Sequence, residues 1–110
     1  MTEAELHDEI VKLCQLRGLW WFHHYDSRQD IPGISNKTEY ERQQAGKGWV
    51  DMVIVGSSAI FAELKSEHER RSRAQIRWAD RIVRAGLAYR LWRPEDLADG
   101  TIAKELEAIR

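Results

Sequence analysis

A carboxylate and an ammonium group lie two residues apart in the stretch FAELKSE, residues 61–67, which follows an apolar segment. Side chains of a strand alternate between its two faces, so Glu63 and Lys65 share a face with Phe61. One interpretation is an ordinary ion pair on a solvent-exposed sheet face. The other is an active site in which a carboxylate binds a divalent cation and the lysine stabilises developing charge. The sequence around this stretch is needed to distinguish the exposed ion pair from the active site.

A second acid lies within reach of this stretch if it forms a hairpin with the segment before it. WVDMVIVG and AIFAELKS are predicted as two strands that meet at a Gly-Ser-Ser turn. A three-residue loop would pair Val55 with Ala59 and place Asp51 opposite Glu63, with Cβ atoms about 5 Å apart. A two-residue loop would place Asp51 opposite Leu64 and separate the two acids. The site therefore depends on the register of the turn.

Two directly opposed acids repel each other, and a divalent cation between them removes that cost. Carboxylate oxygens are the ligands that magnesium and manganese prefer, and magnesium usually takes only one or two of them. We therefore expect Asp51 and Glu63 to be metal ligands, and the backbone carbonyl of Leu64 to be a candidate for another. Lys65 would stabilise negative charge on a phosphate bound at the metal.

The charges of the chain are unevenly distributed, although its net charge is only −1. Residues 65–84 hold seven Lys or Arg against three acids, whereas the first ten residues hold four acids and no Lys or Arg. A local basic field of this kind attracts polyanions, and the alternative is a solvated, arginine-rich helix face. Contacts to nucleic-acid phosphates would be salt-sensitive and independent of base sequence. The candidates for such contacts are Arg70, Arg71, Arg73, Arg77, Lys37, Arg42 and Lys47.

The chain of 110 residues has the length of one domain, and its patterning predicts an α/β fold. The expected order α-β-β-β-α-β with a C-terminal helix gives a mixed four-stranded sheet with helices packed on it. In the second helix we expect Ile76, Ala79, Ile82 and Val83 to face inward, and we expect most of the five tryptophans to lie in the core. The expected helices are 2–17, 72–85 and 101–109, with possible short ones at 38–44 and 95–98, and the expected strands are 19–25, 49–56, 59–66 and 87–93.

Other residue types argue for a plain intracellular protein. No apolar run approaches the roughly 20 residues that span a bilayer, and the N-terminus lacks a signal-peptide pattern. Cys14, the single cysteine, falls in an apolar helical row and is expected to be a core residue. His23 and His24 would face opposite sides of a strand, which argues against a zinc site. We expect a cytoplasmic, reducing setting, with no membrane partner and no small-molecule cofactor.

Two spaced motifs resemble a known nuclease superfamily. Gly48-x-x-Asp51, followed by Glu63-Leu64-Lys65, resembles the PD-(D/E)xK nuclease core. The longer set GKGWVDMVIV, FAELKSE, RAQIRW and AGLAYRLWRP is similar to the VRR-Nuc branch, as found in phage-like single-domain proteins. The resemblance runs from TEAEL near the start to LWRPEDL near the end. It implies a restriction-endonuclease-like core and a single nuclease domain over residues 1–110. The proline usual before the aspartate is Val50 here, a position that chiefly shapes the backbone.

The resemblance also implies roles for individual residues. It makes Asp51 and Glu63 ligands of Mg²⁺ or Mn²⁺ and Lys65 the catalytic lysine, and it adds Gln75 and Glu5 as active-site residues. For the last two the spacing alone favours another reading. Both Thr2-x-x-Glu5 and Ser72-x-x-Gln75 have the pattern of a capping box, in which the side chain only satisfies the backbone of a first helical turn.

The expected function is therefore a divalent-metal-dependent DNA endonuclease that hydrolyses phosphodiester bonds. The resemblance further implies structure-specific cleavage of branched or junction DNA, and a homodimer with two sites. The alternative is a non-catalytic nucleic-acid-binding or assembly module that retains the fold. A broken metal site would mark such a module, whereas Asp51, Glu63 and Lys65 are all present in this chain.

Overall fold

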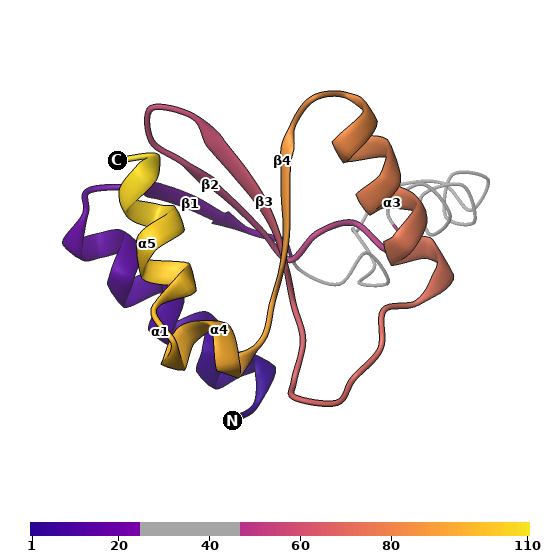
Figure 1. Ribbon diagram of the computed structural model, residues 1–110, viewed down its shortest axis with the longest axis horizontal. Coiled ribbons are helices and arrows are strands. Elements are labelled where there is room, and N and C mark those ends of the chain that lie inside the picture. Colours follow the sequence, from indigo (N-terminus) through magenta and orange to yellow (C-terminus); the bar gives the residue numbers. More distant parts are fainter. Residues whose placement is uncertain (25–46) are drawn as a thin grey trace, which may run out of the picture.

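A hairpin forms the centre of a mixed sheet in the computed structural model, which describes residues 1–24 and 47–110 (Figure 1). Strands β2 (Met52–Val55) and β3 (Ala59–Leu64) make the hairpin. Strand β1 (Trp20–His23) pairs antiparallel with β2, and β4 (Ala88–Trp92) pairs parallel with β3. The described strands thus form a four-stranded sheet in the order β1-β2-β3-β4, which confirms the predicted mixed sheet.

The turn between β2 and β3 has the three-residue register. Val55 pairs with Ala59, and the ladder continues to Met52 and its partner on β3. The backbone N–H and the hydroxyl of Ser57 both donate to the carbonyl oxygen of Ile109, at 2.6 and 3.0 Å. Gly56 passes so close that an added Cβ would lie 2.0 Å from the same oxygen. The C-terminal helix therefore clamps the turn and fixes the register of the hairpin.

Three helices cover one face of the sheet and leave the opposite side to a fourth (Figure 1). They are α1 (Glu3–Leu16), α4 (Pro94–Ala98) and α5 (Thr101–Ala108). Their apolar side chains pack on the residues of the sheet that point toward them, and these form the core together with Trp92. The buried members from helices and sheet are Leu6, Ile10, Cys14, Ile102 and Leu106, with Met52, Ile54, Ile60, Ala62 and Leu64.

Helix α3 (Arg73–Arg84) lies on the other side of the sheet, where it packs chiefly on β4 (Figure 1). Ala79 and Ile82 are buried, as predicted, but Ile76 and Val83 are 47% and 59% exposed, so the prediction for these two was wrong. The physical reason is the position of the helix at one side of the sheet. A helix that contacts mainly one strand buries only a narrow stripe of its surface.

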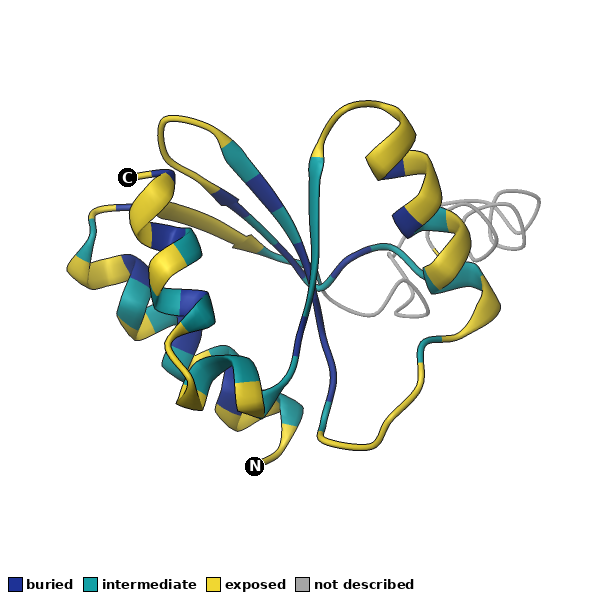
Figure 2. Cartoon of the chain, in the orientation of Figure 1, coloured by how far each residue is buried: buried dark blue, intermediate teal, exposed yellow. Residues whose placement is uncertain are grey.

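The tryptophans also depart from the prediction, because only Trp92 is fully buried. Trp20 is 82% exposed on β1, which is an edge strand, and Phe22, two residues further and thus on the same face, is 63% exposed. Figure 2 shows that most of β1 is exposed. Helix α3 does not extend over this part of the sheet, so aromatic residues there lack the cover that a core position needs. The aromatic residues thus predicted the strand β1 correctly, but the prediction that they are buried was wrong.

Cys14 is a core residue, as predicted, and its burial raises the pKa of the thiol to about 11. None of the helices in the two described ranges is long and apolar enough to cross a membrane. The possible helix at 38–44 lies outside the described residues.

Candidate active site

Asp51 and Glu63 meet where the β2–β3 hairpin opens. The recorded ladder ends with Met52 opposite Ala62, so one further step in this register places Asp51 against Glu63, as the sequence predicted. The backbone of Asp51 is fixed on both sides: its N–H donates to the carbonyl of Ala62 at 3.1 Å, and its carbonyl accepts from the N–H of His24 at 2.8 Å. The two carboxyl groups are close enough for the charge of Asp51 to raise the pKa of Glu63.

The carboxyl group of Glu63 is deeply buried and only half satisfied. The side chain is 1% exposed, and its Oε1 accepts a 2.7 Å hydrogen bond from Nε2 of Gln75. Its Oε2 is buried without a hydrogen-bond partner in the part of the chain that the structure describes. Burial, and next the charge of Asp51, raise the pKa of Glu63 to about 9. This oxygen needs either a proton or a cation.

The backbone of Leu64 completes a set of oxygen atoms at this point. Its N–H donates to Oδ2 of Asp51 at 2.7 Å. Because the N–H and C=O of one strand residue point toward the same neighbouring strand, the Leu64 carbonyl faces the side of Asp51. Two carboxylates and a carbonyl suit a hard cation such as Mg²⁺, which usually takes one or two carboxylates and keeps water or phosphate as further ligands. Among residues 1–24 and 47–110, no three Asp, Glu, His or Cys side chains are arranged so that all of them could bind one metal ion.

Lys65 is the buried cation of this cluster. Its side chain is 8% exposed, and its Nζ lies 3.4 Å from Oε1 of Glu69 in the segment that follows β3. Arg93 holds this segment by donating to the carbonyls of Ser66 and Glu69, at 2.7 and 2.8 Å. An ordinary ion pair on an exposed sheet face is thus excluded for Glu63 and Lys65, because both side chains are buried.

Helix α1 brings Glu3, and not the predicted Glu5, to this cluster. Burial, a hydrogen bond with Glu69 and the charges of Glu69 and Asp51 raise the pKa of Glu3 to about 7. Glu5 is exposed and belongs to the helix cap, since its N–H donates to Oγ1 of Thr2 at 3.1 Å and the Thr2 hydroxyl donates back to its Oε1 at 3.2 Å.

Glu3 and Glu5 are two residues apart and therefore point to nearly opposite sides of α1, so only one of them can face the sheet. Glu3 is three residues before Leu6 and seven before Ile10, and it thereby continues the buried stripe of α1. That spacing was the sequence signal that pointed to Glu3.

Gln75 serves the helix cap and the site at once. Its Oε1 accepts from the N–H of Ser72 at 2.8 Å and its own N–H donates to Oγ of Ser72 at 3.1 Å, which completes the capping box. The remaining group of the side chain, Nε2, reaches Glu63. The capping interaction is therefore present together with a contact to Glu63, and the role of Gln75 in catalysis stays a prediction.

Gly48 is required because the first turn of α3 lies against it. An added Cβ would meet the carbonyl carbon of Ala74 at 2.4 Å and the backbone nitrogen of Gln75 at 2.6 Å. Its φ of +83° also lies in the left-handed region that favours glycine. The glycine of the Gly-x-x-Asp motif thus lets the segment that carries Asp51 approach the helix that carries Gln75.

Tyr89 and Arg71 border the cluster. Tyr89 lies opposite Phe61 in the β3–β4 ladder, and burial raises the pKa of its phenol. Nη1 of Arg71 is 3.5 Å from the Tyr89 hydroxyl, and its guanidinium lies 5.9 Å from the ring centroid. Sequence reasoning missed Tyr89, because its distance in sequence from Glu63 hides their proximity across parallel strands.

The other predicted phosphate contacts are scattered around this region. Arg70, Arg73, Arg77 and Lys47 are exposed, and Arg77 and Lys47 share a pocket described below. Lys37 and Arg42 lie outside the described residues.

The fold of the described residues, a four-stranded mixed sheet with helices on both sides, is shared with a solved structure. A solved structure described as a "VRR_NUC domain protein" matches with a TM-score of 0.59 at 15% sequence identity, over 99% of this chain and 90% of that chain. The resemblance predicted from the motifs is thus confirmed for the fold. No protein-family model and no curated protein matches the chain.

Proposed function

We propose that this chain is a divalent-metal-dependent DNA endonuclease that hydrolyses phosphodiester bonds. The observation that carries the proposal is the buried Oε2 of Glu63, which lies beside a second carboxyl group, that of Asp51, and has no donor among the described residues. Mg²⁺ or Mn²⁺ is the partner that fits two carboxylates and a backbone carbonyl. The nuclease-type fold supports the same function.

Each residue of the cluster has its own role in the proposed hydrolysis. A bound divalent cation would polarise the phosphate and make a water molecule a better nucleophile. Asp51 and Glu63 would hold the cation, and Gln75 fixes the orientation of Glu63 by its hydrogen bond. Lys65, which pairs with Glu69 here, would stabilise the charge that develops on the scissile phosphate. Glu3 supplies a third carboxyl group beside these ligands.

The cost of this arrangement argues for the enzyme over a binding module that retains the fold. A buried carboxyl group with a strongly raised pKa destabilises the charged form of the protein, and perturbed groups of this kind concentrate at functional sites. A module that only binds DNA gains nothing from Glu63 beside Asp51.

Cleavage assays on a panel of DNA structures test the proposal and its finer part, a preference for branched DNA. Plain duplex, flap and four-way junction substrates are incubated with Mg²⁺, Mn²⁺ or EDTA. The proposal predicts cleavage with either metal, none with EDTA, and faster cleavage of the branched substrates. Metal-independent binding without cleavage of any substrate would favour the module.

The homodimer also stays a prediction of the sequence resemblance. Two sites in one particle would suit a branched substrate with two strands to cut. Light scattering in solution should give twice the mass of one chain, and the mass of a single chain would contradict the dimer.

A further inference from the structure

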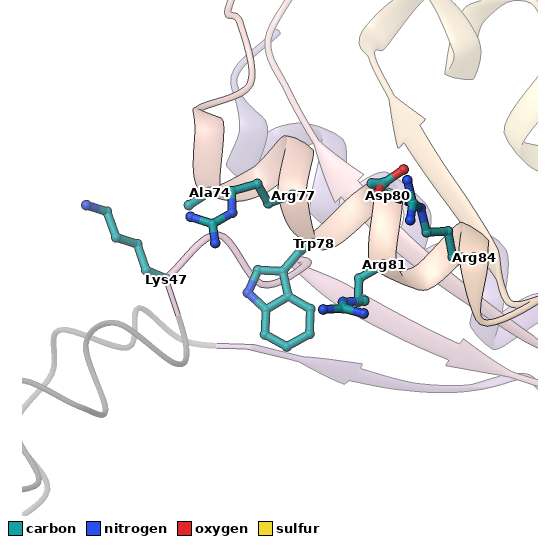
Figure 3. Close-up of a pocket in the computed structure, with 7 residues that line it drawn as sticks. All are labelled: Lys47, Ala74, Arg77, Trp78, Asp80, Arg81 and Arg84. Carbon is teal, nitrogen blue, oxygen red and sulfur yellow. Dashed lines mark ion pairs between the residues drawn. The ribbon is translucent and has the colours of Figure 1, made fainter.

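An open, positively charged pocket lies along α3 (Figure 3), and its lining includes none of the acids Glu3, Asp51 and Glu63. Its volume is about 570 Å³, and its lining includes Lys47, Arg77, Trp78, Asp80, Arg81 and Arg84. The three arginines point away from the inward-facing line of Gln75, Ala79 and Ile82, from which they differ by about 100–180° around the helix axis. The pocket and the acidic cluster therefore use different faces of the same helix.

The charges of this pocket are not balanced. Nε of Arg84 forms an ion pair with Oδ2 of Asp80 at 3.0 Å. Within the described ranges no ion pair neutralises Lys47, Arg77 or Arg81, so the pocket attracts anions. Arg77, Arg81 and Arg84 follow one another at spacings of four and three residues, a stripe about 10 Å long. That length matches about three nucleotides at 3.4 Å of rise per strand.

Trp78 gives the pocket a fixed aromatic wall. Its indole makes an edge-to-face contact with Trp49, with centroids 4.8 Å apart and planes at 79°. Trp49 makes a similar contact with Phe61 of β3, at 6.0 Å and 78°. Figure 3 shows the indole projecting from the helix between Arg77 and Arg81. A ring held in this way loses little conformational freedom when a ligand stacks on it.

We propose that this pocket binds the unpaired nucleotides of a DNA strand, with a base stacked on Trp78 and the flanking phosphates on Arg77 and Arg81. Aromatic rings beside basic side chains are the usual means of binding single strands without sequence preference. The inference rests on the proposed function in one respect, which is that the bound strand belongs to the DNA being cleaved. In a duplex the bases stack on each other, whereas a branch point offers free base faces. The pocket would thus select branched DNA.

Binding of an oligonucleotide tests the site without any cleavage. Fluorescence anisotropy of a labelled twelve-residue oligothymidylate, and of a duplex of equal length, is measured in EDTA at several salt concentrations. The double substitution Arg77→Ala/Arg81→Ala should weaken binding of the single strand about tenfold or more. It should also make the slope of log K against log salt shallower by about 1.4, at about 0.7 per lost contact. Arg110→Ala, an exposed arginine at the C-terminus, is the matched control and should change neither value.

Substitution of Trp78 tests the stacking. Trp78→Ala should weaken single-strand binding about tenfold with no change of the salt slope, since stacking releases no counterions. Because Trp78 packs on Trp49, Trp78→Phe serves as the second variant and should retain most of the affinity. The part of the tryptophan fluorescence that the oligonucleotide quenches should be lost in Trp78→Phe.

Three results would overturn the site. They are no binding of the single strand by the wild type, equal affinities of the double variant and Arg110→Ala, and equal losses for duplex and single strand. A wild type that cleaves no DNA with Mg²⁺ or Mn²⁺ would overturn the proposed function instead, and the binding result would still decide this site.

Discussion

Gln75 donates a 2.7 Å hydrogen bond from Nε2 to Oε1 of Glu63 while its carbonyl oxygen accepts from the backbone of Ser72. The cap fixes which end of the amide faces the site, because only the oxygen can accept from the Ser72 N–H. The capping box, which is common at the start of helices, thereby also orients the buried side chain of Glu63. The start of α3 and the orientation of Glu63 are thus set by one side chain.

Because Gln75 has both roles, two substitutions that both weaken the helix cap should differ in their effect on cleavage. Ser72→Ala removes the cap alone and should lower the free energy of unfolding by about 1 kcal/mol without changing cleavage. Gln75→Ala should cost a similar amount of stability and also slow cleavage about tenfold or more, because Glu63 loses its donor. Thermal unfolding and cleavage rates are measured on both variants. Equal cleavage rates would show that Gln75 only caps the helix.

The acids of α1 provide a matched pair. Glu3→Gln removes the carboxylate that lies with Asp51 and Glu69, and we expect cleavage to slow about tenfold or more. Glu5→Gln changes an exposed cap residue and should leave the rate within about twofold of the wild type. Cleavage rates under saturating Mg²⁺ decide the matter. A slower Glu5→Gln beside a normal Glu3→Gln would restore the assignment made from the sequence.

The raised pKa of Glu63 predicts a pH dependence of stability. Because this pKa is about 9 in the folded chain and 4.5 for a glutamate in water, the folded state holds between these pH values a proton that the unfolded state has lost. Without metal, the free energy of unfolding therefore falls as pH rises from about 4.5 toward 9.

Glu63→Gln cannot ionise, so most of this fall should disappear. What remains should lie below about pH 7, where Glu3 titrates. The melting temperature in EDTA is measured between pH 5 and 9, and at pH 8 the variant should melt several degrees above the wild type, since about 1 kcal/mol is worth about 4–8 °C. Glu95→Gln, an exposed position, is the control. Parallel curves for wild type and Glu63→Gln would contradict the assignment of a buried, protonated Glu63.

Substitutions at Gly48 and Gly86 distinguish the effect of backbone strain from the effect of a steric clash with α3. Both have positive φ, +83° and +78°, but only at Gly48 would a Cβ meet the first turn of α3, since nothing lies within 4 Å of the position at Gly86. Gly86→Ala should cost about 1–2 kcal/mol of stability and leave cleavage intact. Gly48→Ala should cost more and also slow cleavage, because it moves Gln75 away from Glu63. Equal effects of the two substitutions on cleavage would contradict this explanation of the motif.

Local patterns were enough to predict the order of the elements and the hairpin at the site. The apolar runs on both sides of the Gly-Ser-Ser turn predicted the strands but left the loop length open. The structure supplies the three-residue register, with the turn held by Ile109, and so brings Asp51 and Glu63 together. The resemblance to a nuclease fold rested on the same residues.

What the sequence missed depends on how elements are placed in space. Ile76 and Val83 have a helical spacing that fits a buried face, but α3 packs chiefly on β4 and leaves them exposed. Trp20 is exposed for a related reason, since no helix covers its part of the sheet. Tyr89 and Glu69 join the site through strand pairing and a long loop, which no short motif records.

The most direct test of the central claim is the cleavage of a four-way DNA junction by wild type, Lys65→Ala and the matched surface variant Lys12→Ala. Lys65 is buried against the acidic cluster, whereas Lys12 pairs with Glu9 on the exposed side of α1. We predict that wild type and Lys12→Ala cleave with Mg²⁺ and not with EDTA, and that Lys65→Ala is slower by about 100-fold or more. Equal rates for wild type and Lys65→Ala, or cleavage in EDTA, would contradict the proposed active site.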